Sequence, residues 1–245
     1  MHPRIPARSL SGLLALAVLP LALSACSSGG SGGSDPAVAE GLASPAAAAS
    51  SSADPNSGLP TGTLLKGDLL TSGLPSAYAL DSSGSVDTGD SFQDPSATSA
   101  APACSALDAT SWIRLAGYNP VSFAQSDYVD KADSEEYAQE IDTYQGTTAQ
   151  DVMTALAKMH TTCPTFADTA THSTVSVVVS TASTPGDGSV TIALHDTAWV
   201  GFTTLVAVRV NHSVVSVLSS ATSDSTSFAT QRATSIAANL KAGAN

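Results

Sequence analysis

The sequence predicts an α+β fold: an antiparallel sheet packed with helices, forming a single domain behind a disordered N-terminal linker. Three observations predict this class. Val-rich segments lie close together between residues 174 and 218, helical periodicity precedes and follows them, and residues 27–60 contain no aromatic side chain. Strands and helices are therefore segregated along the chain, as in α+β domains.

The first helix is predicted over residues 147–160, where apolar side chains recur at spacings of three and four. These side chains are Ala149, Val152, Met153, Leu156 and Met159. Thr148 and Asp151 resemble a capping box at its start. Residues 136–144, which precede this helix, fit a strand only loosely.

Two hairpins are predicted after the helix. Residues 174–181 and 190–194 alternate in polarity on either side of a Pro-Gly-Asp-Gly turn. Residues 205–210 and 214–218 are rich in valine and are separated only by Asn211-His212. A two-residue connection between such segments is typical of a tight hairpin.

A terminal helix is predicted to begin at Asp224 or Ser225 and to end before Gly243. One face of this helix is expected to be buried: Phe228, Ala229, Ala233, Ile236, Ala237 and Leu240. The prediction completes a pattern in which a helix precedes the Val-rich strands and another follows them.

Residues 1–25 have the pattern of an export signal peptide. Arg4 and Arg8 precede an apolar run over residues 10–23 that is too short to span a membrane and ends in small residues. Leu23-Ser24-Ala25-Cys26 then resembles the bacterial lipobox, whose cysteine becomes the acylated N-terminus. We expect Cys26 to be the lipid-attachment site, with acyl chains such as palmitate as the only membrane attachment. An ordinary secretory signal is the alternative.

Composition divides the remaining chain into a linker and a domain. Residues 26–60 are rich in Ser, Gly, Ala, Pro and Asp and are expected to form a flexible lipidated linker. Its reach as a coil is roughly 30 Å, which suits a spacer through a cell wall, although a tail without that role has the same composition. Residues 61–245 form the predicted domain, with a poorly ordered low-complexity loop at about 81–103.

Cys104 and Cys163 remain once Cys26 is acylated. An exported chain lies in an oxidising compartment, so we expect these two cysteines to form a disulfide. Closing a loop of about 60 residues stabilises a domain by roughly 4 kcal/mol in the chain-entropy model.

The domain begins with Leu64-Leu65, Asp68-Leu69 and Leu74-Pro75, followed by Cys104, the helix ending near Cys163, the Val-rich hairpin and the Ala-rich terminal helix. This order resembles the actinobacterial PknH-type extracellular sensor domain family, which occurs on receptor kinases and on free lipoproteins. The resemblance covers residues 63–241. It implies an antiparallel sheet backed by helices around a broad cleft that binds an unidentified extracellular ligand. Cys104 and Cys163 match cysteines that flank the family's helical segment, and the second disulfide common in kinase-linked members has no counterpart here.

No residues form a recognisable catalytic motif. Asp87-Thr88-Gly89 is the tripeptide of aspartic proteases, but it occurs once, in a Ser- and Gly-rich stretch that favours a loop. His195-Asp196 would be part of a catalytic triad, but no Gly-x-Ser-x-Gly segment supplies a nucleophile, so a surface position is favoured. We expect no catalytic residue, no enzymatic activity and no cofactor.

Metal binding is not predicted either. Four histidines lack the spacing of zinc ligands: His160, His172, His195 and His212. Seven acidic residues lie between positions 127 and 142: Asp127, Asp130, Asp133, Glu135, Glu136, Glu140 and Asp142. The run lacks glycine and EF-hand order, so we interpret it as a solvated acidic face, with calcium binding as the alternative.

Charge and aromatic content limit the remaining functions. Nine Lys and Arg against 21 Asp and Glu give a net charge of −12, which argues against nucleic acid as a partner. Trp112 and Trp199 are interpreted as core aromatics, with the lining of a ligand cleft as the alternative.

The sequence therefore predicts a lipoprotein at the extracytoplasmic face of the cell membrane, with a non-catalytic ligand-binding or sensor-like domain. Its partner would be an unknown small ligand or envelope protein. An envelope protein–protein interaction module is the alternative, and a secreted hydrolase is a third hypothesis.

Overall fold

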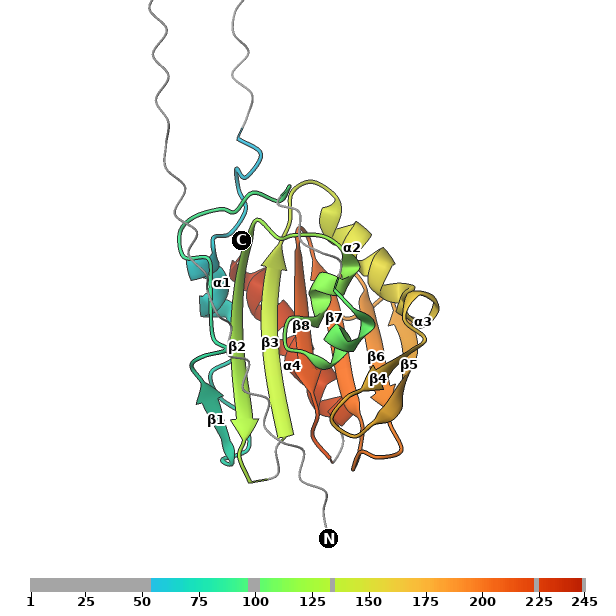
Figure 1. Cartoon of the computed structure of the whole chain (residues 1–245). Coiled ribbons are helices and arrows are strands. Elements are labelled where there is room, and N and C mark those ends of the chain that lie inside the picture. Colours follow the sequence, from blue (N-terminus) through green and yellow to red (C-terminus); the bar gives the residue numbers. More distant parts are fainter. Residues whose placement is uncertain (1–53, 97–101, 133–134, 223–224, 244–245) are drawn as a thin grey trace, which may run out of the picture. The chain divides into compact units, whose positions relative to one another are not determined.

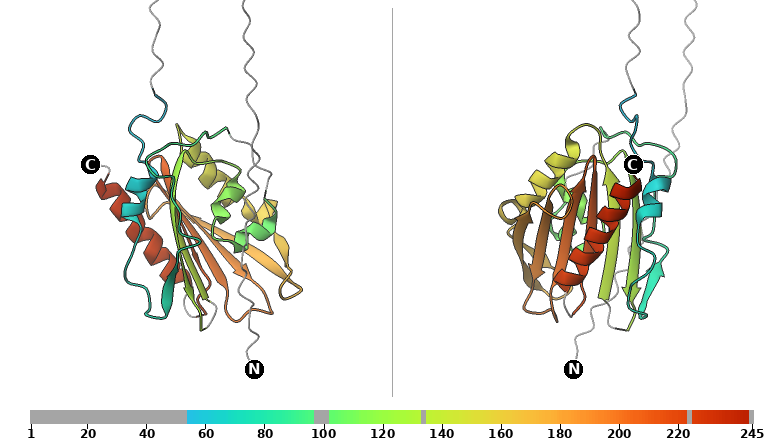
Figure 2. Two further views of the ribbon diagram at one scale, coloured as in Figure 1. Left: turned by 60° about the vertical axis from the view of Figure 1, so that its left-hand side comes forward. Right: turned by 180° about the vertical axis from the view of Figure 1, so that it is seen from behind.

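A computed structural model of the chain contains one eight-stranded antiparallel sheet between two helical layers (Figures 1 and 2). The structure describes residues 54–96, 102–132, 135–222 and 225–243. These residues confirm the predicted α+β class with a single domain. The predicted signal peptide, Cys26 and linker residues 26–53 lie outside the described residues.

The strands are β1 (Tyr78–Asp81), β2 (Ser122–Asp130), β3 (Glu135–Thr143), β4 (Thr165–Asp168), β5 (Ser173–Ala182), β6 (Ser189–His195), β7 (Thr203–Val210) and β8 (Ser213–Ser219). The helical elements are α1 (Gly62–Asp68), the 3-10 segments η1 (Cys104–Asp108) and η2 (Trp112–Ala116), α2 (Thr148–Ala157), α3 (Met159–Thr162) and α4 (Ser225–Gly243).

The strand order is β1-β2-β3-β8-β7-β6-β5-β4. After β3 the chain passes through α2 and α3 to the far edge of the sheet, then returns strand by strand until β8 pairs with β3. All other neighbouring strands are consecutive in sequence, so most pairing is local. The β3–β8 pair joins the two halves of the domain.

Both predicted hairpins are confirmed, because β5 pairs with β6 and β7 pairs with β8. Asn211 has a φ of 54° in the β7–β8 turn. Two-residue hairpin turns require this left-handed conformation, which Asn tolerates better than most residues. The loosely predicted strand over 136–144 corresponds to β3.

The predicted helix over 147–160 is confirmed as α2, which is followed after Lys158 by the short α3. The predicted capping box is wrong, because the N-cap residue is Thr147 and it makes no side-chain capping hydrogen bond. The terminal helix is confirmed as α4, which continues one residue beyond the expected end to Gly243.

The first part of the low-complexity stretch at 81–103 lies beside β2. The Val86 and Gln125 backbones exchange two hydrogen bonds, of 3.2 and 2.8 Å, and Thr88 N donates to Phe123 O at 3.1 Å. The chain after β1 therefore continues along the edge of β2, which supplies backbone partners that a polar composition does not reveal. Apart from the isolated bridge between Asp87 and Ala124, residues 82–96 consist of turns and irregular backbone, and residues 97–101 lie outside the described residues.

The rear face of the sheet is covered by α4, with α1 beside it (Figure 2, right). The predicted face of α4 is buried at Ala229, Ala233, Ile236, Ala237 and Leu240, and Phe228 is partly buried. Small alanines let the helix approach the sheet closely, and the sheet supplies larger partners: Tyr137, Ile141, Val206, Val208, Val215 and Val217. Strands β7 and β8 are consequently buried along almost their whole length.

The front face is covered by η1, η2, α2 and α3 (Figure 1). Their shared core contains Leu107, Trp112, Ile113, Val152 and Leu156 against the front-facing residues of the sheet. Trp112 is fully buried there, which confirms its interpretation as a core aromatic. The expected disulfide is also present: Cys104 at the start of η1 is bonded to Cys163 after α3.

Candidate functional site

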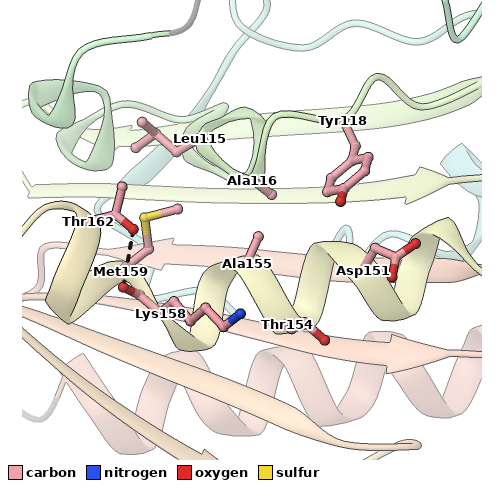
Figure 3. Close-up of a pocket in the computed structure, with 9 residues that line it drawn as sticks. All are labelled: Leu115, Ala116, Tyr118, Asp151, Thr154, Ala155, Lys158, Met159 and Thr162. Carbon is pink, nitrogen blue, oxygen red and sulfur yellow. Dashed lines mark hydrogen bonds between the residues drawn. The ribbon is translucent and has the colours of Figure 1, made fainter.

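A groove of about 350 Å³ separates η2 and the residues after it from α2 and α3 (Figure 3). Its lining comes from two segments far apart in sequence. One wall consists of Leu115, Ala116 and Tyr118, and the other of Asp151, Thr154, Ala155, Lys158, Met159 and Thr162. Figure 3 shows Ala155 pointing from α2 toward the opposite wall, where the Tyr118 ring enters the groove.

The periodicity of α2 explains how this helix forms one wall. Ala149, Val152 and Leu156 are buried against the sheet. Asp151, Thr154 and Lys158 lie on the other side of the same helix and are exposed. The hydrophobic side of α2 therefore anchors the helix, and its remaining side presents a mixed surface to the groove.

The groove combines apolar and polar chemistry. Leu115, Ala116, Ala155 and Met159 provide apolar contact surface, while the Tyr118 hydroxyl and two threonine hydroxyls can form hydrogen bonds. Asp151 and Lys158 carry opposite charges about 10 Å apart along the helix, given a rise of about 1.5 Å per residue. Such a lining suits a small amphipathic ligand.

The predicted solvated acidic face is wrong for the strand residues of the acidic run. Asp127, Asp130, Glu140 and Asp142 are buried, with exposed fractions of 4, 6, 1 and 1% respectively. Glu135 and Glu136 are half-buried, and Asp133 lies outside the described residues. The run occupies β2 and β3, which are interior strands covered by η2 in front, and this cover is a tertiary effect that charge patterning does not reveal.

Glu140 and Asp142 lie on the front face of β3, two residues apart. No N–H or O–H group donates a hydrogen bond to either carboxylate among the described residues. The two carboxyls can instead form a hydrogen bond with each other through a shared proton. Ser216, directly opposite Glu140 on β8, and Trp112 Nε1 also lack hydrogen-bond partners in this part of the chain.

Burial raises the pKa of both carboxyls. The pKa of Asp142 rises to about 7, mainly through loss of solvation, and is partly held down by the positive charge of Arg114. The pKa of Glu140 is raised well above its ordinary value by burial and by the neighbouring Asp142. The pair therefore holds at least one proton at neutral pH.

A hydrogen-bonded network beside this pair links β2 to the turn between η1 and η2. The Gln125 amide donates to both Asp127 carboxylate oxygens at 2.9 Å and to Thr110 Oγ1 at 3.1 Å, and Ser111 Oγ donates to Gln125 Oε1 at 3.0 Å. Burial nevertheless raises the pKa of Asp127 to about 6. This network holds the η1–η2 turn against the sheet.

The other candidate residues from the sequence do not assemble into a site. Asp87 forms a salt bridge with Lys66 at 2.9 Å, so the carboxylate of the Asp-Thr-Gly segment is paired with a cation. The His195 ring packs on Phe202 at 5.2 Å, while Asp196 accepts a hydrogen bond from Ser173. His195 and Asp196 therefore contact different partners and do not have the geometry of a catalytic triad.

The four histidines are exposed and lie on different elements. Among the residues that the structure describes, no group of three or more His, Cys, Asp or Glu is placed to hold a metal ion. Within the same residues, no helix has the length and apolar content needed to cross a bilayer. Trp199 is half-buried and donates its Nε1–H to Asp168 at 2.9 Å, away from the groove.

A second groove of about 300 Å³ lies between the β1 region and the start of α4, lined by Pro75, Tyr78, Glu135, Ala221, Ser227, Phe228 and Gln231. Its one carboxylate, Glu135, already accepts hydrogen bonds from the Tyr78 hydroxyl and from Thr222 N and Oγ1, at 2.7–2.9 Å. Its charged group is therefore already engaged, so the first groove is the better candidate.

Comparison of the chain with protein-family models, with curated proteins and with solved structures finds no match. The functional argument therefore depends on the residues of this chain alone.

Proposed function

We propose that this protein is a lipoprotein of the extracytoplasmic face of the cell membrane, whose domain binds a small amphipathic ligand without chemical turnover. The observation that carries this proposal is the mixed groove between η2 and α2. The disulfide between Cys104 and Cys163 supports it, because it ties the two segments that form the walls. Fixed walls lower the ordering cost of binding.

Anchoring in the membrane is supported by the lipobox-like segment ending at Cys26. We expect Cys26→Ala to move the protein from the membrane fraction to the medium, or to leave it uncleaved, because the acyl chains are the proposed attachment. Cell fractionation with immunodetection, together with mass spectrometry of the mature N-terminus, measures this. A Cys26→Ala protein that is still processed and still bound to membranes would refute the anchor.

Ligand binding in the groove can be tested by filling it. Ala155 is half-buried and faces the opposite wall, so Ala155→Tyr should obstruct the groove (Figure 3). The matched control is Gln150→Tyr, an equally bulky change on exposed α2 surface outside the groove lining. We expect wild type and Gln150→Tyr purified from the native envelope to carry a small-molecule ligand in native mass spectrometry. The Ala155→Tyr protein should lose this ligand at least tenfold.

The same ligand at equal occupancy in all three proteins would place binding elsewhere. Absence of any ligand from wild type, together with no rise in melting temperature across amphipathic compounds, would contradict the binding proposal. A ligand at 100 times its Kd raises stability by about 2.7 kcal/mol, so the melting assay is sensitive enough.

A protein-interaction module is the second candidate, and one observation favours it. The rear face of β5 is not covered by α4, and Thr174, Ser176, Val178 and Ser180 are exposed there. Val178 is a large apolar side chain with 55% exposure. Reproducible crosslinking of an envelope protein to this face, with no small ligand in wild type, would favour the interaction module.

A further inference from the structure

The inference concerns the cap, which we define as residues 104–117, containing η1 and η2. The cap contributes Leu107, Trp112 and Ile113 to the front core, and all three are buried. Leu115 and Ala116 from the same segment line the groove. A movement of the cap therefore changes one wall of the groove directly.

The carboxyl pair lies beneath this cap. Gln125, which is bonded to Ser111 of the cap, pairs across the sheet with Glu140. Phe123 pairs with Asp142, and Arg114 of the cap lies over the Phe123 ring at 5.6 Å. These two cross-strand rows place Glu140 and Asp142 under the η1–η2 turn and η2.

The groups that the neighbouring strands and η1 place around Glu140 and Asp142 are acidic or uncharged. They therefore do not offset the negative charge that the pair would gain if both carboxyls ionised. β2 contributes the buried Asp127, and β3 contributes Glu136 and is followed directly by Tyr144. η1 contributes Asp108, which acts on Glu136. β8 contributes Ser216, which carries no charge.

Two cations lie in the same region. Arg114 is attracted to both carboxylates, but it is exposed and forms no ion pair with them in the described part of the chain. Arg209 of β7 lies in the same cross-strand row as Asp142 and is engaged with Asp187 at 3.6 Å. Arg114 is therefore the cation nearest the pair, and it belongs to the cap.

We propose that the cap is a pH-sensitive lid on the groove, closed while Glu140 and Asp142 share protons and loosened when both carboxyls ionise. Full ionisation leaves two adjacent buried charges to which no group of the described residues donates a hydrogen bond, which is strongly unfavourable. Moving η2 outward admits water to both carboxylates and lets Arg114 approach them. The disulfide keeps η1 attached at Cys104, so the movement is confined to the η2 side. The lid role rests on the proposed groove function, whereas the cap movement does not.

Trp112 reports on the cap because it belongs to η2 and its side chain is fully buried in the front core. In a Trp199→Phe background Trp112 is the remaining tryptophan, since the chain has two. We expect acrylamide quenching of its fluorescence to rise at least twofold between pH 5 and pH 8.5. The Glu140→Gln/Asp142→Asn protein, whose amides do not ionise, should show equal quenching at both pH values. Asp90→Asn removes an exposed carboxyl and should behave as wild type.

Hydrogen exchange of the wild-type protein provides a measurement without mutation in the pair. After correction for intrinsic exchange, protection of residues 105–117 should fall at least fivefold between pH 5 and pH 8.5, while α4 retains its protection. Quenching that is independent of pH, or cap and α4 protection that change together, would overturn the lid. These measurements use no ligand, so their outcome does not depend on whether the groove binds one. A failure of ligand binding can therefore be distinguished from a failure of the cap to move.

Discussion

Replacing Cys104 and Cys163 together by alanine is expected to lower the free energy of unfolding by about 2–5 kcal/mol. The bond joins residues 59 positions apart, so its loss frees a long loop in the unfolded chain. It also connects the cap to the end of α3, and Cys163 is only 3% exposed within the front core. For a core built largely from valine and alanine, this is a large share of the stability.

Denaturant melts of the Cys26→Ala protein with and without the additional Cys104→Ala/Cys163→Ala change measure the effect without interference from the lipid. Ser105→Ala/Thr161→Ala is the matched control, because both positions are exposed neighbours of the two cysteines. The control should change stability by less than about 0.5 kcal/mol. Equal stability of the cysteine and alanine proteins, or two titratable thiols in the native oxidised sample, would contradict the prediction.

The second half of the sheet could be predicted because its patterns are local. β5 alternates between buried and exposed residues, since α4 leaves its rear face open. β7 and β8 are valine-rich segments joined by Asn211-His212, which fixes their pairing. In these strands the local pattern of side chains is sufficient to predict the secondary structure and the pairing.

The first half could not be predicted in the same way. β2 has no apolar alternation, and its buried Gln125 and Asp127 are satisfied by each other and by the cap. The segment around Val86 is held to β2 by backbone hydrogen bonds and by the hydroxyls of Ser85 and Thr88. Long-range partners decide these elements, and a local pattern does not contain them.

The candidate site was only partly accessible from sequence. The helical periodicity located α2, but nothing singled out Leu115, Ala116 or Tyr118 as the opposite wall. For the carboxyl pair one signal was present: Glu140 and Asp142 share strand parity with Ala138 and Tyr144, which are buried on the front face. Charged side chains normally indicate a solvated surface. The charge pattern therefore predicted exposure, although the strand positions of the two residues indicated burial.

The domain is expected to be more stable at pH 5 than at pH 8, with a progressive loss of stability between these two values. Five carboxyls have raised pKa values in the folded protein: about 6 for Asp127, about 7 for Glu136 and Asp142, well above the ordinary value for Glu140, and above the ordinary value for Asp68. Burial is the largest cause in each case, and neighbouring carboxyls add to it for Glu136 and Glu140. The folded state therefore holds protons that the unfolded chain releases near pH 4.

The sign of the pH dependence follows from these directions. A raised carboxyl pKa gives stability that is fully present below the unfolded pKa of about 4, and this stability is lost progressively as the pH rises from there through the folded pKa values of about 6 to 7 and above. Each pKa unit corresponds to about 1.4 kcal/mol, so the loss from pH 5 to pH 8 is on the order of 3–6 kcal/mol after allowance for relaxation. Half-buried carboxyls with lowered pKa, such as Asp81 and Asp87, act in the opposite sense only below about pH 4.

Urea melts at half-unit intervals from pH 4.5 to pH 8.5 measure this dependence, with Glu140→Gln/Asp142→Asn as the test variant. Because amides do not titrate, the variant should lose at least half of the wild-type decrease, and the remainder should come from Asp127 and Glu136. Asp90→Asn should leave the curve unchanged, since its carboxyl is exposed. A wild-type protein whose stability rises between pH 5 and pH 8 would show that Glu140 and Asp142 are solvated or ion-paired in solution, and the buried pair beneath the cap would then be wrong.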